Sequence, residues 1–381
     1  MAALAIAGAA VLVVLLGGAA WFYSGQIRAG ALAAKAPAGP EYRVEVLKAG
    51  SGSVTLAHLP EVRGLAAEGI WGLRQRDGYG QLGRIEKQGD GSVIRAYRHL
   101  TGSRPRPGER VAVELGAYPS PAYIFGGEYD TISYKTDLGP TPAWLKRGRR
   151  RTWVVFVHGY NAPRTEHLRL ASRVTREGYP ALLLSYRNDP GAPQTQDKLR
   201  QWGQTEWRDV EGSVRYALDH GARRVALIGV SMGAAVVTSF LYESKLAERV
   251  SGVVLDSPAL DFEAVVDYEA KERQLPVLGT AIPAPLASAA KALAARRYGI
   301  DWAATDYVRR SKELRTPALV VHGTADKTVP IAISEELARA RPDLVELVRV
   351  PRAGHVEGWN YARQRYEREV IAFLRRFDEA Q

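Results

Sequence analysis

The sequence predicts an α/β fold, with a mostly parallel sheet covered by helices on both faces, and two observations support this. From about residue 141 onward, apolar runs of strand length alternate with amphipathic helical patterns. The run Thr152–Val157 is continuously apolar, as in a strand buried on both faces. In such folds the functional groups gather at the carboxyl ends of the strands. A β-rich unit and an apolar N-terminal segment are expected ahead of this domain.

The composition limits the classes of protein that the chain can belong to. With 381 residues, it has room for two domains or for one large domain with an appendage. Hydrophobic residues make up 46% and charged residues 24%, which excludes a disordered chain. The absence of cysteine excludes disulfides, thiolate metal sites and cysteine nucleophiles. The oligomeric state stays open.

The net charge of +11 is compatible with an anionic partner surface or simply with a basic, soluble exterior. Residues 1–150 hold 19 Lys and Arg against 12 Asp and Glu, so the excess lies mostly in the first part of the chain. No nucleic-acid-binding motif of known spacing is present, and nucleic acid is not an expected partner.

Residues 1–27 predict a transmembrane anchor. No charged side chain occurs from Ala2 to Tyr23, a stretch that as a helix covers roughly the 30 Å hydrocarbon core of a bilayer. Trp21 and Tyr23 stand where an interfacial aromatic belt is found. No Lys or Arg precedes the run, which argues against a cleavable signal peptide, although cleavage near residues 31–34 is the alternative. We therefore expect a single-pass membrane protein.

The orientation of this anchor is predicted from few charges. Arg28, Lys35 and Arg43 follow the apolar run, and by the positive-inside rule they favour a cytoplasmic catalytic domain. Because only three charges carry the argument, export of the domain stays open. The basic cluster at 146–151 fits contact with anionic headgroups and fits a solvated loop at least as well.

Two segments separate the anchor from the α/β domain. Residues 28–40 are rich in Ala, Gly and Pro and predict a flexible linker. Residues 41–140 predict a small antiparallel β unit, since short apolar stretches alternate there with turn residues. These stretches are Tyr42–Leu47, Ser53–Leu59, Gly69–Leu73, Ser92–Tyr97, Arg110–Leu115 and Thr131–Lys135. The unit shows no cluster of catalytic side chains, so a scaffolding or substrate-positioning role is expected.

The α/β domain is expected over 141–381, with an insertion over 257–316. The expected strands are Thr152–Val157, Ala181–Ser185, Arg224–Gly229, Val250–Leu255, Ala318–His322 and Leu344–Val350. The expected helices are Arg164–Glu177, Gln204–His220, Gly233–Ser244, Ile333–Arg341 and Asn360–Phe377. About 60 residues between two strands exceed a usual connection, so 257–316 predicts a cap. Apolar cap residues such as Leu275 and Val277 would make a hydrophobic entry.

A Gly-x-Ser-x-Gly pentapeptide, residues 229–233, lies between a predicted strand and a predicted helix. A serine hydroxyl is a poor nucleophile unless it is exposed to a base, and a sharp strand-to-helix turn exposes it. Such a turn needs minimal side chains on both sides, which Gly229 and Gly233 provide. Ser231 is thus the candidate nucleophile. The amide of Met232 falls at the helix N-terminus, where negative charge is favoured.

An acid and an imidazole follow in loops after later strands. Asp326 follows the strand 318–322, and His355 follows the strand 344–350. In this arrangement His355 would take the proton of Ser231, and Asp326 would hold the imidazole in the required tautomer. Asp256 and Asp261, which follow the strand 250–255, are the alternative acids.

The segment His158-Gly159-Tyr160 ends an earlier strand and supplies a second candidate oxyanion donor, the Tyr160 N–H. His158 and His322 are interpreted as structural residues, not as bases. The remaining histidines have no partners at metal-ligand spacing, so neither a metal nor a cofactor is expected.

The stretch from Trp153 to Phe377 resembles the α/β-hydrolase superfamily of serine esterases, lipases and serine peptidases. It is most similar to the membrane-anchored, BEM46-like and prolyl-oligopeptidase-related branch. The motifs that carry the resemblance are residues 157–159, 229–233, 322–326, 329–330 and 353–355, together with 301–302 and 307–308. The resemblance implies an α/β-hydrolase fold, with Ser231 as nucleophile, Asp326 as acid, His355 as base, and Tyr160 and Met232 as oxyanion donors. Relatives often have Arg-Gly-x-Gly after the fourth strand, where this chain has 186–190, so that loop predicts no substrate.

The predicted activity is that of a serine hydrolase that cleaves an ester-type acyl substrate, either a small molecule or a lipid-like compound, through an acyl-enzyme. A serine peptidase or an acyltransferase would use the same triad. A non-catalytic, hydrolase-like binding module is the alternative outside the enzymes, although such modules usually lose the serine, the histidine or an elbow glycine.

Overall fold

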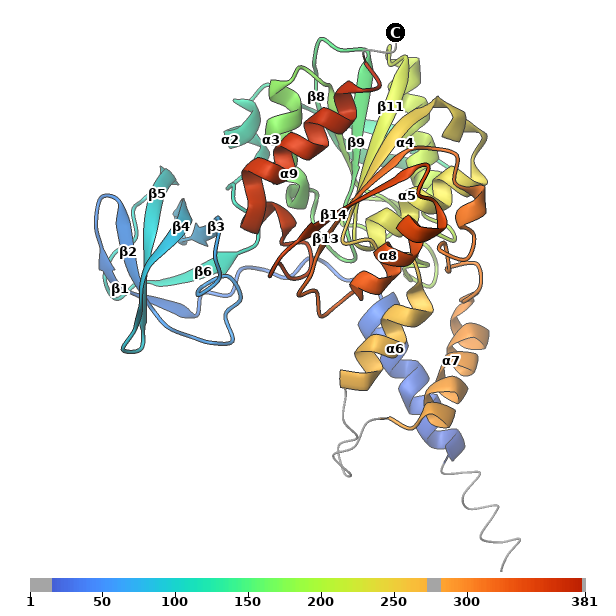
Figure 1. Cartoon of the computed structure of the whole chain (residues 1–381), viewed down its shortest axis with the longest axis horizontal. Helices are drawn as coiled ribbons and strands as arrows, with labels where there is room; N and C mark the ends of the chain where they lie inside the picture. Colours follow the sequence, from blue (N-terminus) through green and yellow to red (C-terminus); the bar gives the residue numbers. More distant parts are fainter. Residues whose placement is uncertain (1–15, 273–281, 379–381) are drawn as a thin grey trace, which may run out of the picture.

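The computed structural model describes residues 16–272 and 282–378, and an eight-stranded sheet forms its centre (Figure 1). The strands follow the order β14-β13-β12-β11-β9-β10-β8-β7. Only β8 runs antiparallel to its neighbours β7 and β10, and the other pairs are parallel. The bounds are β7 Asp130–Thr136, β8 Gly139–Lys146, β9 Thr152–Val157, β10 Ala181–Leu184, β11 Arg224–Val230, β12 Val250–Asp256, β13 Ala318–Gly323 and β14 Val345–Val350. The predicted, mostly parallel sheet is confirmed.

Helices cover both faces of this sheet because alternate side chains of each strand point to opposite sides. In β9, Val154 and Phe156 pack in one buried cluster, with residues of α3 (Leu168–Arg176) and α9 (Gly358–Arg375). Val155 and Val157 pack in the other cluster, with residues of α4 (Trp207–Asp219), α5 (Met232–Glu243) and α8 (Ile331–Ala340).

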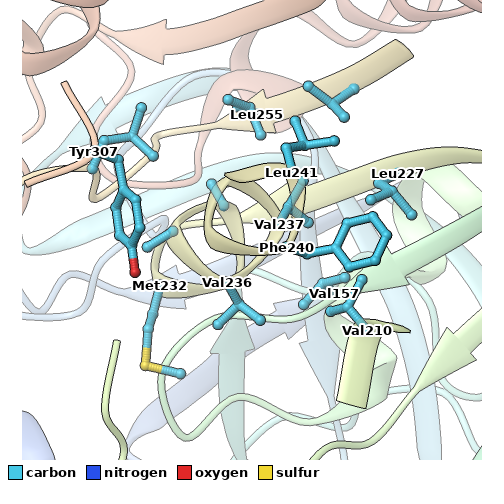
Figure 2. Packing of buried hydrophobic residues seen from close by; sticks show 14 of the residues in the cluster. Val157, Val210, Leu227, Met232, Val236, Val237, Phe240, Leu241, Leu255 and Tyr307 are labelled. Atoms are coloured by element: carbon cyan, nitrogen blue, oxygen red, sulfur yellow. The ribbon is translucent and has the colours of Figure 1, made fainter. Parts of the chain in front are cut away.

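Helix α5 lies in the middle of the second cluster (Figure 2). Val236, Val237 and Phe240 are fully buried there, and the helix is apolar on nearly every side. A helix that is apolar all round is stable only in a protein interior. The strand-to-helix turn at its start therefore sits on a rigid base.

Six strands ahead of the sheet close into a barrel in the order β1-β2-β5-β4-β3-β6. Their bounds are β1 Val44–Ala49, β2 Ser53–Ala57, β3 Trp71–Arg74, β4 Gly78–Gly89, β5 Ser92–Gly102 and β6 Arg110–Glu114. Inside the barrel unit, the buried Arg95 guanidinium donates to the carbonyls of Gly64, Leu65 and Ala67. These bonds fix the loop between β2 and β3, which faces the α/β domain.

The boundary between the β unit and the α/β domain differs from the prediction of 140. The barrel ends at Glu114, and α2 (Pro121–Phe125) follows it. The stretch Thr131–Lys135, predicted as part of the β unit, lies in β7, the edge strand of the main sheet. A hairpin has the same local pattern in either domain. The β7–β8 hairpin belongs to the main sheet because β8 pairs with β10, and local sequence does not encode this long-range pairing.

The predicted linker over 28–40 is also corrected in its first part. Residues 16–27 are helical and continue into a π-helical turn, Arg28–Leu32. Leu32 is fully buried, and Ala33 forms a β-bridge with Leu199. We call residues 28–35 the N-terminal strap. It is held by tertiary contacts that composition alone does not reveal.

The predicted anchor is not seen as a membrane-spanning helix among the described residues. In the part of the chain that the structure describes, no helix is long and apolar enough to cross a membrane. The predicted span from Ala2 to Tyr23 falls mostly on residues 1–15, outside the described residues. The anchor and its orientation stay predictions.

The cap lies between β12 and β13, as expected, and contains α6 (Phe262–Glu272) and α7 (Ala284–Tyr298). The helix of residues 16–27 runs alongside these two helices (Figure 1). Arg297 of α7 lies 3.4 Å above the Trp21 ring and donates to Ser24 Oγ at 2.6 Å. Leu275 and Val277, named above as entry residues, lie outside the described residues.

Candidate active site

The turn between β11 and α5 has the geometry of a nucleophile elbow. Ser231 stands between the two elements with φ 52° and ψ −119°, a conformation that a residue with a side chain rarely adopts. Main-chain bonds hold it there, because its N–H donates to Asp256 O at 2.9 Å and its carbonyl accepts from the Ala234 N–H at 3.0 Å. The strain is thus maintained by the surrounding structure.

Both glycines of the pentapeptide are required because main-chain atoms of neighbouring residues approach them closely. A Cβ atom on Gly229 would lie 2.7 Å from Ala234 Cα. A Cβ atom on Gly233 would overlap the carbonyl oxygens of Val157 and His158. Helix α5 can start directly behind the sheet only because these two side chains are missing.

The three predicted catalytic side chains meet above this turn. His355 Nε2 lies 2.9 Å from Ser231 Oγ, and His355 Nδ1 lies 2.7 Å from Asp326 Oδ2. Asp326 follows β13 and His355 follows β14, two neighbouring parallel strands that bring their following loops to the same edge. The Asp326 carboxylate is buried, and the His355 side chain is 15% exposed.

Four donors surround the Asp326 carboxylate. Oδ1 accepts the N–H groups of Thr328 at 2.8 Å and Val329 at 2.9 Å, while His355 and His322 both face Oδ2. Burial by itself raises the pKa of Asp326, but hydrogen bonds from His322 and His355 outweigh it and hold the pKa well below its ordinary value. The carboxylate is therefore ionised at neutral pH and fixes the His355 proton on Nδ1.

His322 is a site residue that the sequence interpretation missed. It was expected to be a packed core residue, and it is fully buried in β13. However, its Nε2 also lies 3.2 Å from Asp326 Oδ2, and its Nδ1 lies 2.7 Å from Ser334 Oγ. The four-residue spacing from His322 to Asp326, across a strand end, is the signal that could have suggested this contact.

The two alternative acids lie elsewhere. Asp261 caps the start of α6 by accepting the Ala264 N–H at 2.9 Å. Asp256 accepts from the Tyr366 hydroxyl at 2.8 Å and from Ser257 Oγ at 3.1 Å. Neither carboxylate is bonded to His355.

Asp256 instead supports the loop that carries the imidazole. The Val356 N–H donates to Ser257 Oγ at 3.0 Å, and Ser257 Oγ in turn bonds to Asp256. Val356 has φ 59°, an uncommon value for a β-branched residue, so this loop needs such support. Arg169 adds a bond to the Val356 carbonyl at 3.2 Å. A buried polar network therefore fixes the position of His355.

Two main-chain amides are available beside Ser231 for an oxyanion. Met232 is the first residue of α5, where an N–H has no intrahelical acceptor. The Tyr160 N–H likewise finds no acceptor in the described part of the chain. The Gly159 N–H just before it is bonded to Glu166 Oε2 at 2.9 Å, which fixes this turn. The Tyr160 hydroxyl has a different partner, because it donates to Ala33 O at 2.8 Å.

The loop at 186–190, where the chain departs from its resemblance, supports the same turn. His158 Nε2 lies 2.7 Å from Asp189 Oδ2, and Arg200 Nη2 lies 2.6 Å from Asp189 Oδ1. The His158 ring stacks on Tyr186 at 4.4 Å between centroids. His158 therefore has the structural role expected of it, and its partners come from that loop.

Ser231 and His355 open into a cavity of about 270 Å³. The strap, the cap and the barrel unit all contribute to its wall. Its apolar side chains include Leu115, Trp202, Val265, Val266, Val329 and Val356. Arg63, from the barrel loop fixed by Arg95, also lines it and forms an ion pair with the buried Glu357. Across residues 16–272 and 282–378, no group of three or more acidic or histidine side chains is placed to hold a metal ion.

Residues 154–369, more than half of the chain, match the model of the alpha/beta hydrolase family. The chain belongs to this family. The predicted α/β-hydrolase superfamily is therefore confirmed. The closer assignment to the BEM46-like branch stays a prediction.

Individual relatives are distant. A 2-hydroxy-6-oxononadienedioate/2-hydroxy-6-oxononatrienedioate hydrolase of Burkholderia vietnamiensis is 38% identical over 71 residues, 19% of this chain and only 24% of that protein. The Pyrococcus furiosus esterase Pf2001 aligns with TM-score 0.54 and 19% identity over 68% of this chain and 97% of its own. A second crystal form of that esterase gives the same TM-score at 20% identity. These structures support the fold alone.

Proposed function

We propose that this protein is a serine hydrolase that cleaves an ester-type acyl substrate through an acyl-enzyme on Ser231. The single observation that carries the proposal is the His355 imidazole, bonded through Nε2 to Ser231 Oγ and through Nδ1 to the Asp326 carboxylate. In the family to which the chain belongs, this arrangement activates a serine.

In the first half-reaction, His355 Nε2 takes the proton as Ser231 Oγ attacks the substrate carbonyl carbon. The carbonyl π electrons move to oxygen, and the amides of Met232 and Tyr160 stabilise this oxyanion, each by about 3 kcal/mol. Asp326 stabilises the imidazolium without taking its proton. When the tetrahedral intermediate collapses, the C–O bond to the leaving alcohol breaks and His355 donates the proton to that alcohol.

In the second half-reaction, water replaces the alcohol. His355 Nε2 takes a proton from water as its oxygen attacks the acyl carbon, and the same two amides hold the second oxyanion. Collapse breaks the bond to Ser231 Oγ, which regains the proton from His355, and the carboxylic acid leaves. An acyltransferase would use an alcohol or amine in place of water, so product analysis distinguishes the two.

The lining of the cavity supports an apolar acyl group. Valines 265, 266, 329 and 356 line the same cavity as Ser231, and burying an apolar group among them is favourable by about 25 cal/mol per Å². A charged acyl group would lose its hydration there, and the Arg63 guanidinium in the lining is already paired with Glu357. This favours an ester of a neutral, apolar acid over a charged or peptide substrate.

A fluorophosphonate probe tests the proposed nucleophile, because it reacts only with an activated serine. We expect labelling of the wild-type protein and loss of labelling in Ser231→Ala and His355→Ala. Ser92→Ala, in the barrel, is the matched control and should label normally. Equal labelling of Ser231→Ala and the wild type would refute the assignment.

We further propose that residues 1–27 anchor the protein in a membrane, with the catalytic domain on the cytoplasmic side. Support comes from three large apolar side chains, Leu16, Trp21 and Phe22, which are more than half exposed on the N-terminal helix. Exposed apolar groups of this kind mark a contact with lipid or protein. A reporter that is active only after export, fused after residue 40, tests the orientation, and a strong signal would place the domain outside.

A further inference from the structure

A second pocket lies between the N-terminal helix, α6 and α7, outside the cavity that contains Ser231. These three helices run side by side in Figure 1. The pocket is small, about 50 Å³, and is lined mostly by apolar side chains. The helix of residues 16–27 contributes Tyr23 and Ile27, and the cap contributes Val266, Ala270, Ala287 and Ala290. We call it the helix pocket. Its small volume and apolar lining suit a segment of hydrocarbon chain.

The helix pocket adjoins the Ser231 cavity directly. Four residues line both the helix pocket and the Ser231 cavity: Gly30, Ala31, Val266 and Glu269. No more than one layer of residues therefore separates the two cavities. Gly30 and Ala31, in the strap, are among the smallest side chains available for such a partition. A chain that starts at Ser231 and passes the strap therefore enters the helix pocket.

The ammonium group at the helix pocket is compensated within the protein. Lys291 lines the pocket, and its Nζ lies 2.7 Å from both Glu263 and Asp267. Because this ammonium already has two carboxylate partners, it offers no free counter-charge to an anionic ligand. The chemistry of the pocket is that of its apolar wall.

We propose that the Ser231 cavity and the helix pocket form one site for a linear aliphatic acyl chain. The ester carbonyl lies at Ser231, the first methylenes pass Val265 and Val266, and the tail lies between the N-terminal helix and the two cap helices. This inference rests on the proposed serine hydrolase and adds its substrate class, esters of unbranched acids of medium or greater length. It also makes the N-terminal helix part of the substrate site.

The test compares p-nitrophenyl acetate with p-nitrophenyl decanoate on the full-length protein in detergent. Ala287→Phe and Ala270→Phe place a ring in the helix pocket, from α7 and α6 respectively. We expect kcat/KM for the decanoate to fall at least ten-fold in both variants, while kcat/KM for the acetate changes less than two-fold. Ala289→Phe, exposed on α7 and not part of the pocket, is the matched control and should leave both esters unaffected.

Two outcomes overturn the inference. In the first, kcat/KM of the pocket variants falls equally for the decanoate and the acetate. In the second, the pocket variants hydrolyse the decanoate at the wild-type rate. Fluorophosphonate labelling of Ser231, measured in the same samples, separates this failure from failure of the proposed function. If the wild type labels and hydrolyses acetate while the pocket variants keep decanoate activity, only the acyl site is wrong.

Discussion

At the scale of single residues, the Asp326 carboxylate connects two imidazoles and two main-chain amides at the strand end that precedes the catalytic loop. Such a group is stable as an anion only because every donor faces it at once. Its charge in turn orients His355. In the proposed mechanism the residue therefore contributes to both stability and catalysis, and its titration links the two.

The depressed pKa of Asp326 predicts a pH-dependent contribution to stability. Because the pKa is lower in the folded state than in the unfolded state, the stabilisation is complete at neutral pH and is lost as the pH falls below about 4. We expect Asp326→Asn to lower the free energy of unfolding by about 2 kcal/mol at pH 7. This difference should shrink as the pH falls from 5 to 3. Urea unfolding at each pH measures it, and a constant difference would contradict the assignment.

The elbow glycines make a second prediction at this scale. Gly233→Ala adds a methyl group where the carbonyls of Val157 and His158 already lie, and we expect it to cost about 3 kcal/mol of unfolding free energy. Gly52→Ala is the control, because no atom lies within 4 Å of its added Cβ. Chemical denaturation measures the unfolding free energy of both variants. Equal values would contradict a close approach of main-chain atoms to Gly233.

At the scale of elements, the loop after β14 is held by groups from β12, α3 and α9. Ser257 follows β12 and Arg169 lies in α3, while Tyr366 of α9 bonds to Asp256. His355 is thus positioned by three elements besides its own strand. Catalysis needs this because a shift of about 1 Å in a catalytic group can cost about a hundred-fold in rate.

Ser257→Ala tests whether this network positions the imidazole. The change removes the acceptor of the Val356 N–H, so we expect kcat to fall about ten-fold while KM stays within two-fold. A merely structural role would instead lower the unfolding free energy with kcat unchanged. Ser251→Ala, within β12, the strand that Ser257 follows, is the matched control and should leave both constants unaltered.

At the scale of the whole molecule, the barrel unit contacts the catalytic loop. Arg63 forms an ion pair with Glu357, and Glu357 accepts the N–H of Gly354, next to His355, at 2.7 Å. Asn360, at the start of α9, donates to the carbonyls of Ile70 and Leu115 in the barrel unit. The unit predicted as a scaffold therefore reaches the active site.

Arg63→Ala tests the barrel's contribution. Removing the guanidinium leaves the buried Glu357 without its partner and changes one wall of the Ser231 cavity. We expect kcat/KM to fall about five-fold, while the unfolding free energy changes by less than about 1 kcal/mol because the Arg63 side chain is 57% exposed. Arg84→Ala, an exposed barrel pair with Glu86, is the control. Unaltered kinetics in Arg63→Ala would limit the barrel to a structural role.

The sequence predicted those parts of the site that depend on local patterns. The elbow at 229–233 is one such part, since its glycines and flanking apolar runs are neighbours in the chain. Asp326 was predicted as the acid, but local patterns did not exclude Asp256, because both carboxylates lie at or just after the ends of buried strands. The packing of α9, whose Tyr366 donates to Asp256, separates the two. Local patterns likewise could not assign 130–136 to the main sheet, since that depends on pairing across the hairpin and with β10.

The strap shows the same limit. Residues 28–40 are rich in Ala, Gly and Pro and so predicted a flexible linker, yet within the strap Trp202 donates to Ala31 O at 2.9 Å and Tyr160 donates to Ala33 O. These bonds use main-chain carbonyls, which every residue has. Sequence gives no sign of which carbonyls a distant side chain will reach. The contribution of the strap to the cavity therefore emerged only from the structure.

The most direct test of the central claim is to trap the covalent intermediate. The protein is mixed with an excess of p-nitrophenyl ester, quenched in acid within milliseconds, digested and examined by mass spectrometry. The proposed acyl-enzyme mechanism predicts one acyl group on the peptide that carries Ser231, and a burst of p-nitrophenol that approaches one equivalent per enzyme molecule. An acyl group on another residue, or undiminished hydrolysis by Ser231→Ala, would contradict it.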